Sequence, residues 1–215
     1  MNKSAPPQAK KRPRQSRSQM LVRSITQACV KVLESEGPDK LTTQRIADVA
    51  GVNIASVYQY FPNKEAVLAD VFSEQLEKLS EEAGGEFSRI HKLSEQSLEA
   101  TLAAIIAMEA RFLSKLYQLL PDFYLQYESS FDILHSVDEL TQSQSNPSWE
   151  SWFPDFLARH KSQLRDGDLA TMAFIARQSL ESCLRKALSE RPAALEQESF
   201  REEVLILLLR YLLRD

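Results

Sequence analysis

The sequence is poor in the residues that build disulfide-rich, metal-binding and membrane-spanning proteins. Its 215 residues include only two cysteines and three histidines. Cys29 and Cys183 lie in apolar patterns of helical spacing, and the histidines are dispersed, so neither disulfides nor a metal site is expected. No apolar run approaches the roughly 18 residues that a transmembrane helix needs. We therefore expect a protein of the reducing cytoplasm that makes no membrane contact.

Signatures of catalysis are absent as well. The sequence has no glycine-rich phosphate loop and no nucleophile motif, and no apolar segment follows its basic N-terminus as in a signal peptide. It has only 5 glycines and 9 prolines, so regular structure is rarely interrupted. Ala, Leu, Glu, Gln, Lys and Arg dominate, and they favour helix. The sequence therefore predicts an all-α fold without enzymatic activity or cofactor.

Charge is distributed unevenly along the chain. The net charge is −4, yet residues 1–64 carry 11 Lys or Arg against 4 Asp or Glu. Residues 65–215 carry 15 basic and 26 acidic side chains. Residues 1–64, which we call the head, are thus basic, and residues 65–215, the body, are acidic. This distribution indicates that the head binds a polyanion. Chance clustering of solvated charge is the simpler alternative.

The N-terminal segment 1–16 cannot bury a core. It holds Pro6, Pro7 and Pro13 and five basic residues without an acid, a composition typical of disorder. Two interpretations stay open. The segment is a tail without function, or it is an arm that follows the phosphate backbone or enters a minor groove of DNA.

Residues 17–36 repeat apolar side chains every three or four positions, which predicts an amphipathic helix that Gly37 ends. Residues 42–61, TTQRIADVAGVNIASVYQYF, then fit a helix-turn-helix. Thr42 or Thr43 can cap the first short helix. Gly51 supplies the backbone freedom that the tight turn requires.

The second short helix is expected from Asn53 or Ile54 to Phe61, and Asn63 caps the helix after it. The side of the second helix that faces away from Ile46 and Val57 carries small or hydrogen-bonding side chains and no acid. Such a surface suits a DNA groove.

The run from Leu41 through Glu65 resembles the DNA-binding domain of the TetR (tetracycline repressor) family. The resemblance covers roughly residues 18–72 and rests on Thr42, Ile46-Ala47, Ala50-Gly51-Val52, Val57-Tyr58, Tyr60-Phe61 and Lys64-Glu65. Asn53 and Ala55 stand where Ser and Gly are frequent in the family. These two departures bear on which bases are recognised.

The resemblance implies a set of DNA contacts from both short helices and the start of the next. Small side chains would line the major groove, and hydroxyl, amide and ammonium groups would reach phosphates. The residues so assigned are Thr42, Thr43, Gln44, Asn53, Ile54, Ala55, Ser56, Tyr58, Gln59, Tyr60 and Lys64. Alternatively, Tyr58 and Tyr60 are ordinary half-buried aromatics and Lys64 is a solvated lysine.

Gly84-Gly85 is the one glycine pair in the sequence and predicts a boundary. It would separate a DNA-binding domain, 17–83, from a helical regulatory and dimerisation domain, 84–215. Nine to ten helices are expected in all. Those beyond the boundary are expected at about 95–119, 123–140, 148–164 (with a kink at Pro154), 168–189 and 195–214, with a loop at 141–147.

The last two predicted helices carry long apolar stripes. Resemblance to the family implies that they pair with a second copy in a four-helix interface, whereas the alternative is that they close the chain's own core. The residues assigned to the interface are Leu169, Met172, Ala176, Leu180, Cys183, Leu184, Val204, Leu208 and Tyr211. A two-fold dimer would bind a palindromic operator.

Family members commonly hold an inducer in this body, and the body of this chain is rich in aromatic residues. The candidate ligand residues are Phe112, Leu116, Tyr124, Tyr127, Trp149, Trp152, Phe153 and Phe174. They would suit a small apolar or aromatic molecule. An aromatic stripe of helical spacing is equally a feature of an ordinary core.

The expected function is that of a homodimeric repressor which a small ligand releases from double-stranded DNA. One alternative is an architectural or partner-controlled DNA binder without an inducer. The other is an all-α enzyme or interaction module, for which the sequence offers no cluster of titratable groups.

Overall fold

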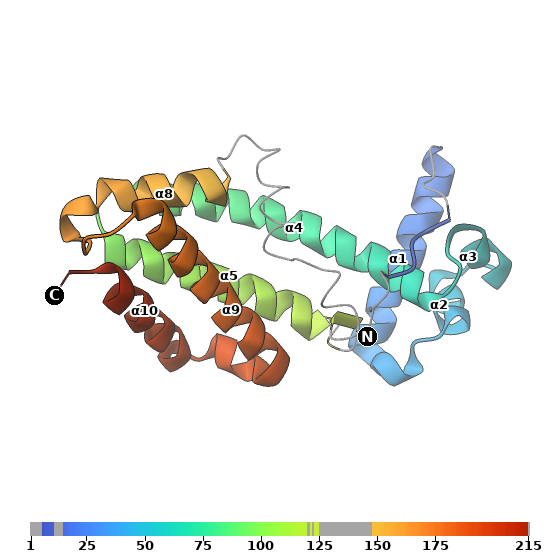
Figure 1. The fold of residues 1–215 in the computed structure, drawn as a ribbon. Coiled ribbons are helices and arrows are strands. Elements are labelled where there is room, and N and C mark those ends of the chain that lie inside the picture. The colour runs from blue at the N-terminus through green and yellow to red at the C-terminus, as the bar shows by residue number, and fades with distance from the viewer. Residues whose placement is uncertain (1–5, 11–14, 120, 122, 125–147, 215) are drawn as a thin grey trace. The chain divides into compact units, whose positions relative to one another are not determined.

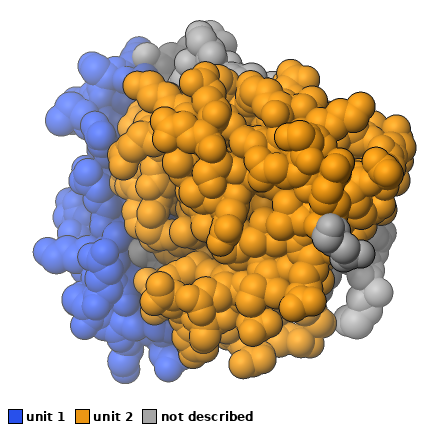
Figure 2. Space-filling view, turned by 90° about the vertical axis from the view of Figure 1, so that its left-hand side faces the viewer, with its two compact units in different colours: residues 1–76, 119–132 blue, residues 77–118, 133–215 orange. Residues whose placement is uncertain are grey.

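A computed structural model of the chain describes residues 6–10, 15–119, 121, 123–124 and 148–214. Over these residues the chain forms eight α-helices and short 3-10 turns (Figure 1), and the only β pairing there is an isolated bridge between Leu164 and Leu213. The predicted all-α fold is therefore confirmed. The chain divides into two compact units, residues 1–76 with 119–132 and residues 77–118 with 133–215 (Figure 2).

The first unit begins with a helix that packs against two short ones. Its elements are α1 (Ser16–Glu36), η1 (Pro38–Lys40), α2 (Thr43–Ala50), α3 (Ile54–Tyr60) and the part of α4 (Lys64–Leu93) up to Leu76. Helix α1 packs against both α2 and α3. These bounds agree with the helices expected from the sequence.

The core of this unit is formed by apolar side chains from all four helices. Those with no exposed surface are Ile25, Cys29, Val32, Ile46, Ala47, Val57, Phe61, Ala66, Val67, Val71 and Phe72. Each large side chain contributes about 1.5–3 kcal/mol when fully buried. Helices as short as α2 and α3 are unstable alone, so this burial is what holds them.

The second unit contains the rest of α4 and the C-terminal helices. Its further elements are α5 (Leu98–Leu119, of which Leu119 falls to the first unit), α8 (Trp149–Arg159), η3 (Lys161–Gln163), α9 (Leu169–Glu190), η4 (Pro192–Glu196) and α10 (Glu198–Leu212). Helix α9 packs against α8, α10 and η4. Side chains cap three of the helices, since Ser97, Ser148 and Asp168 each accept a backbone N–H in the first turn.

The structure corrects several expectations. The chain does not break at Gly84-Gly85, because α4 continues through both residues and the two units divide between Leu76 and Glu77. Glycine costs a helix up to about 1 kcal/mol per residue, and burial of Leu79, Ala83, Phe87 and Ile90 along α4 outweighs this.

Two of the expected helices are shorter than predicted. Helix α8 ends at Arg159 rather than at residue 164, and α10 begins at Glu198 rather than at residue 195. Pro154 lies inside α8 without ending it. Of the helix expected at 123–140 only Phe123 and Tyr124 belong to the described residues, and the loop expected at 141–147 lies outside them.

Replacing Gly85 by alanine is expected to stabilise the protein. A Cβ at Gly85 would meet no atom within 4 Å, so the variant gains helix propensity of about 0.5–1 kcal/mol without a clash. Gly51→Ala is the matched control, because the φ of Gly51 is +67° and alanine there is strained by about 1–2 kcal/mol. Calorimetry should show a higher unfolding temperature for G85A and a lower one for G51A. A lower temperature for G85A would contradict the packing described for α4.

Candidate nucleic-acid interface and candidate ligand site

Two polar side chains fix the starts of the short helices. The Thr42 Oγ1 accepts a 3.0 Å hydrogen bond from the Arg45 backbone N–H at the start of α2. The Asn53 Oδ1 accepts a 2.8 Å bond from the Ala55 N–H at the start of α3. Such a cap contributes about 1 kcal/mol to helix stability. Thr42 and Asn53, both assigned to DNA contact, therefore also position the two helices.

The turn between α2 and α3 depends on Gly51, whose φ of 67° and ψ of 32° lie in the left-handed region that favours glycine. The Gly51 N–H donates to the Asp48 carbonyl at 3.2 Å, and the Val52 N–H donates to the Ala47 carbonyl at 3.0 Å. Val52, the residue after Gly51, is half-buried. The packing between the two short helices comes from the fully buried Ile46, Ala47 and Val57.

All eleven predicted DNA contacts reach the surface. Thr42, Gln44, Asn53, Ala55, Tyr58 and Gln59 are exposed, and Thr43, Ile54, Ser56, Tyr60 and Lys64 are half-buried. Helix α3 carries no acidic side chain, so no charge along it repels phosphate. The predicted residues thus lie on α3 and on the helices next to it, and α3 itself is capped and packed against a buried core.

Two of these side chains also have partners within the chain. The Lys64 ammonium donates to the Leu41 carbonyl at 3.1 Å, and the Gln44 Nε2 donates to the Asp48 Oδ1 at 2.7 Å. The first bond ties the start of α4 to the residue before Thr42. An ammonium has three donors, so Lys64 can serve this structural role and still face a phosphate.

The end of α1 is joined to α2 by an exposed ion pair. The Arg45 Nη2 lies 2.6 Å from the Glu36 Oε1, and the guanidinium of Arg45 lowers the pKa of the Glu36 carboxyl. Exposed pairs contribute little to stability. This pair neutralises the charge of Arg45.

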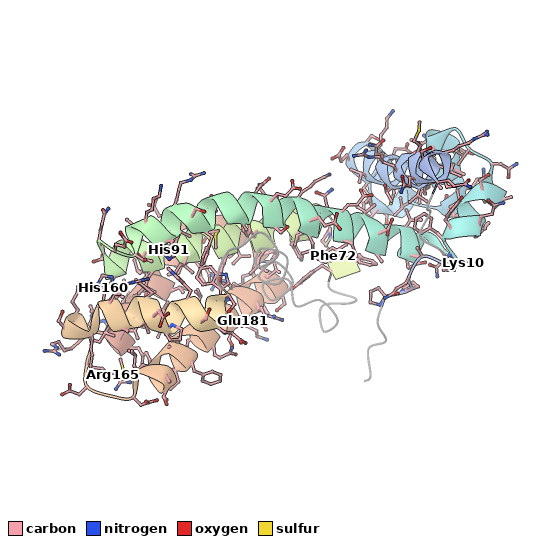
Figure 3. All side chains as sticks on the ribbon, turned by 90° about the horizontal axis from the view of Figure 1, so that it is seen from above. Lys10, Phe72, His91, His160, Arg165 and Glu181 are labelled. Atoms are coloured by element: carbon pink, nitrogen blue, oxygen red, sulfur yellow. The ribbon has the colours of Figure 1, made fainter. Side chains whose placement is uncertain are left out.

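Lys10 makes a contact with α3 that no pattern in the sequence predicts. Its backbone N–H donates to the Tyr60 carbonyl at 2.7 Å, and its ammonium donates to the Tyr58 carbonyl at 3.1 Å (Figure 3). A single lysine in a proline-rich segment has no periodicity that would indicate a partner.

In the second unit, three predicted ligand residues lie together on α8. The rings of Trp149 and Trp152 meet edge to face with centroids 5.2 Å apart, and Phe87 of α4 contacts both. Phe153 contacts Phe156, which stacks on Trp152 at 5.3 Å. All these rings are at most 9 % exposed. We call this set of α8 and α4 side chains the aromatic cluster.

One polar atom of the aromatic cluster lacks a partner in the part of the chain that the structure describes. The indole Nε1 of Trp152 is buried and has no hydrogen-bond partner among the described residues. A buried donor left without an acceptor costs about 1–3 kcal/mol, and buried tryptophans usually find a partner. The cluster therefore contains a donor that an acceptor could satisfy.

A buried ion pair adjoins the aromatic cluster. The Arg177 Nη1 of α9 lies 2.9 Å from the Glu109 Oε1 of α5, and Glu109 is only 2 % exposed. The guanidinium also lies over the Trp149 ring, 5.6 Å from its centroid. A buried carboxylate requires such a cation, so these contacts tie α5, α8 and α9 together at one place.

The other predicted ligand residues are not all brought to the aromatic cluster. Phe112 and Leu116 are buried on α5, whereas Phe174 is 66 % exposed on α9. Tyr124 is buried and belongs to the first unit. Tyr127 lies outside the described residues.

A separate groove in the second unit is lined mainly by charged and hydrogen-bonding residues. Its volume is about 440 Å³, and it is lined by α5, η4 and α10 through Ala107, Arg111, Ser114, Lys115, Gln118, Leu195, Glu196 and Arg201. Arg111 and Lys115 are paired with Glu86 and Glu82 of α4. None of the predicted ligand residues lines this groove.

Most of the predicted dimer residues are buried within a single chain. Met172, Ala176, Leu180, Leu184, Val204 and Leu208 are 0–4 % exposed, whereas Leu169, Cys183 and Tyr211 are half-buried. The six buried side chains close the chain's own core and leave no surface for a partner. The large apolar side chains that α9 and α10 do expose are Phe174, Ile175, Ile206 and Leu207.

Within the described ranges, no group of three or more His, Cys, Asp or Glu side chains is placed to hold a metal ion. No helix in the same part of the chain is both long and apolar enough to cross a membrane.

Two family models match the sequence. The model of bacterial regulatory proteins of the tetR family matches residues 25–71, and the model of the tetracyclin repressor-like C-terminal domain matches residues 97–212. The two matches cover the candidate nucleic-acid interface and most of the second unit. No curated protein sequence matches the chain.

Solved structures share the fold. A protein of unknown function from Rhodococcus sp. RHA1 is 17 % identical with a TM-score of 0.53, over 90 % of this chain and 96 % of that chain. SmeT, the repressor of the Stenotrophomonas maltophilia multidrug efflux pump SmeDEF, is 18 % identical with a TM-score of 0.50, over 92 % and 93 %. A TetR-family transcriptional regulator from Streptomyces coelicolor is 23 % identical with a TM-score of 0.48, over 89 % and 96 %. At these identities the first two similarities show a common fold.

Cys29 is expected to resist alkylation in the folded protein. Burial behind the helix-turn-helix raises the pKa of its thiol to about 12, and the thiolate is the reactive form. Treatment with iodoacetamide at pH 8, followed by peptide mass spectrometry, should leave Cys29 unmodified until guanidinium unfolds the chain. Modification of folded Cys29 at the rate of the unfolded chain would contradict the described core.

Proposed function

The chain belongs to the TetR family of bacterial regulatory proteins, and we propose that within this family it is a homodimeric repressor that a small ligand releases from a palindromic operator. Membership makes it a DNA-binding transcriptional regulator. The repressive sign, the dimer, the operator symmetry and the ligand are the proposal. DNA binding is assigned to the first unit, and dimerisation and ligand binding to the second.

The observation that carries the proposal is the outward surface of α3. Asn53, Ala55, Tyr58 and Gln59 are exposed there, on a helix that a cap, a left-handed glycine and a buried core hold in place. In the proposed complex, α3 lies in the major groove with Asn53 through Ser56 at base edges. The hydroxyls of Tyr58 and Tyr60 contact phosphates.

The dimer is proposed to form through the outer faces of α9 and α10. Phe174 is 66 %, Ile175 39 %, Ile206 44 % and Leu207 48 % exposed in one chain. Large apolar side chains gathered on neighbouring helices favour burial against a partner, and a two-fold axis lets the same face serve both copies.

The ligand is proposed to bind at the aromatic cluster. The unsatisfied indole N–H of Trp152 supports a ligand that carries a hydrogen-bond acceptor on a planar, apolar frame. Such a ligand would favour a conformation of the dimer in which the spacing of the two α3 helices no longer matches the operator.

Substitutions in the head are expected to separate affinity from base preference. Tyr58→Phe and Lys64→Ala should weaken binding to all sequences, because they remove phosphate contacts. Asn53→Ala and Ser56→Ala should change which duplex is preferred, because one base contact discriminates by about 1–3 kcal/mol. Gel-shift titrations on duplexes selected from a randomised library would measure both affinity and base preference.

The control for these head variants is Gln178→Ala, which changes an exposed residue of α9. Unchanged affinity and preference in all four head variants would refute the proposed interface.

A charge on the outer face of α10 is expected to dissociate the dimer. Light scattering after gel filtration should give about twice the 24.5 kDa chain mass for the wild-type protein. Leu207→Glu should give the mass of one chain, because the dimer would bury an unpaired carboxylate. Met20→Glu is the matched control, since Met20 is 70 % exposed on α1 and should leave the dimer intact. A dimeric L207E protein would show that the interface lies elsewhere.

A planar ketone is expected to engage the indole N–H of Trp152. The chain has two tryptophans, so a ¹⁵N-tryptophan-labelled sample gives two indole resonances, which Trp152→Phe assigns. Titration with 1-indanone should move the Trp152 proton downfield, whereas indane has the same frame without the carbonyl and should not. The same response to both probes would contradict the role of the acceptor. Binding of neither would favour a regulator controlled by a partner protein.

A further inference from the structure

We infer that Lys10 is part of the DNA-binding surface, because it caps the C-terminal end of α3 and positions the side chains that face phosphate. This inference rests on the proposed role of α3 in DNA binding. It adds a residue that neither the helix-turn-helix motif nor the matched range of the family model, residues 25–71, contains.

The C-terminal end of α3 has a carbonyl that the helix cannot satisfy. In a continuing helix, the carbonyl of Tyr58 would accept the N–H of residue 62. Residue 62 is a proline and has no N–H. One residue earlier, the Val57 carbonyl does receive its bond, from the Phe61 N–H at 2.9 Å. The Tyr58 carbonyl therefore depends on a donor from outside the helix.

Lys10 supplies that donor and a second one. Its ammonium donates to the Tyr58 carbonyl at 3.1 Å, and its backbone N–H donates to the Tyr60 carbonyl at 2.7 Å. Figure 3 labels Lys10 in this part of the first unit. A cation at the C-terminal end of a helix also interacts favourably with the helix dipole.

The capped turn is the one that presents side chains to phosphate. Tyr58, Gln59 and Tyr60 are the last three residues of α3, and Tyr58 is 44 % exposed. A helix of seven residues frays readily when its terminal carbonyls lack partners. By holding the carbonyls of Tyr58 and Tyr60, Lys10 limits the directions in which the two phenol rings can point. Lys10 is thus a positioning residue of the interface.

The experiment compares five forms of the chain on one DNA probe, namely the wild type, Tyr58→Phe and three lysine substitutions. The probe is the duplex that the wild-type chain enriches most from a randomised library, and a scrambled duplex is the reference. Lys10→Met keeps the aliphatic chain and removes the donor, and Lys10→Arg keeps a cationic donor. Lys31→Met is the matched control, because it removes the same charge from an exposed position of α1.

Loss of the ammonium should weaken specific binding about three- to tenfold, the effect of one charged capping bond. Lys10→Arg should restore most of the affinity, and Lys31→Met should change it little. The salt dependence of binding and the unfolding temperature should match those of the wild-type chain. Amide hydrogen exchange without DNA should be faster at the end of α3 in K10M only.

Three results would overturn the inference. The first is K10M binding as tightly as wild type while Tyr58→Phe binds more weakly, which would leave the proposed function intact. The second is a fall of about 0.9 in the salt slope with unchanged exchange in α3, because Lys10 would then contact a phosphate directly. The third is a wild-type chain that prefers no duplex, which would overturn the proposed function as well.

Discussion

The DNA-binding head depends on the burial of a few apolar side chains from helices that could not fold alone. Helix α2 has eight residues and α3 has seven, and helices of this length are unstable in water. Ile46, Val57 and Phe61 have no exposed surface, and α1, α2 and α3 pack against one another. The proposed DNA contacts are exposed or half-buried side chains of α2, α3, their N-caps and the start of α4. The directions in which these side chains point are therefore only as well defined as the packing behind them.

Local features of this head could be predicted from the sequence because their causes are local. Thr42 and Asn53 cap the helices that they precede, and Gly51 adopts the left-handed conformation that the turn requires. Helix α4 continues through Gly84-Gly85, because the buried residues along it outweigh a weak local preference for a break. The contact of Lys10 with α3 spans 48 residues, and no spacing or composition encodes such a distance.

In the second unit, the periodicity of apolar residues does not distinguish core residues from interface residues. A stripe of apolar residues indicates that side chains share a helix face, but it does not tell which neighbour covers that face. Met172, Leu180 and Leu208 are therefore core residues of one chain, although the stripe alone was equally compatible with an interface. Phe174 lies one residue beyond a buried position on α9, and that single step turns its ring to solvent. Only the fold shows which side chains of α9 and α10 are exposed on their outer face.

The aromatic cluster gives the protein an optical signal from a single place. Both tryptophans of the chain, Trp149 and Trp152, lie on α8 with their rings in contact. Tryptophan emission of the folded protein therefore originates entirely in the second unit, next to Phe87 and the imidazole of His91. Events at the DNA-binding head can alter that emission only if they are transmitted to α8. The spectrum of the unlabelled protein is thus a direct monitor of coupling between the two units.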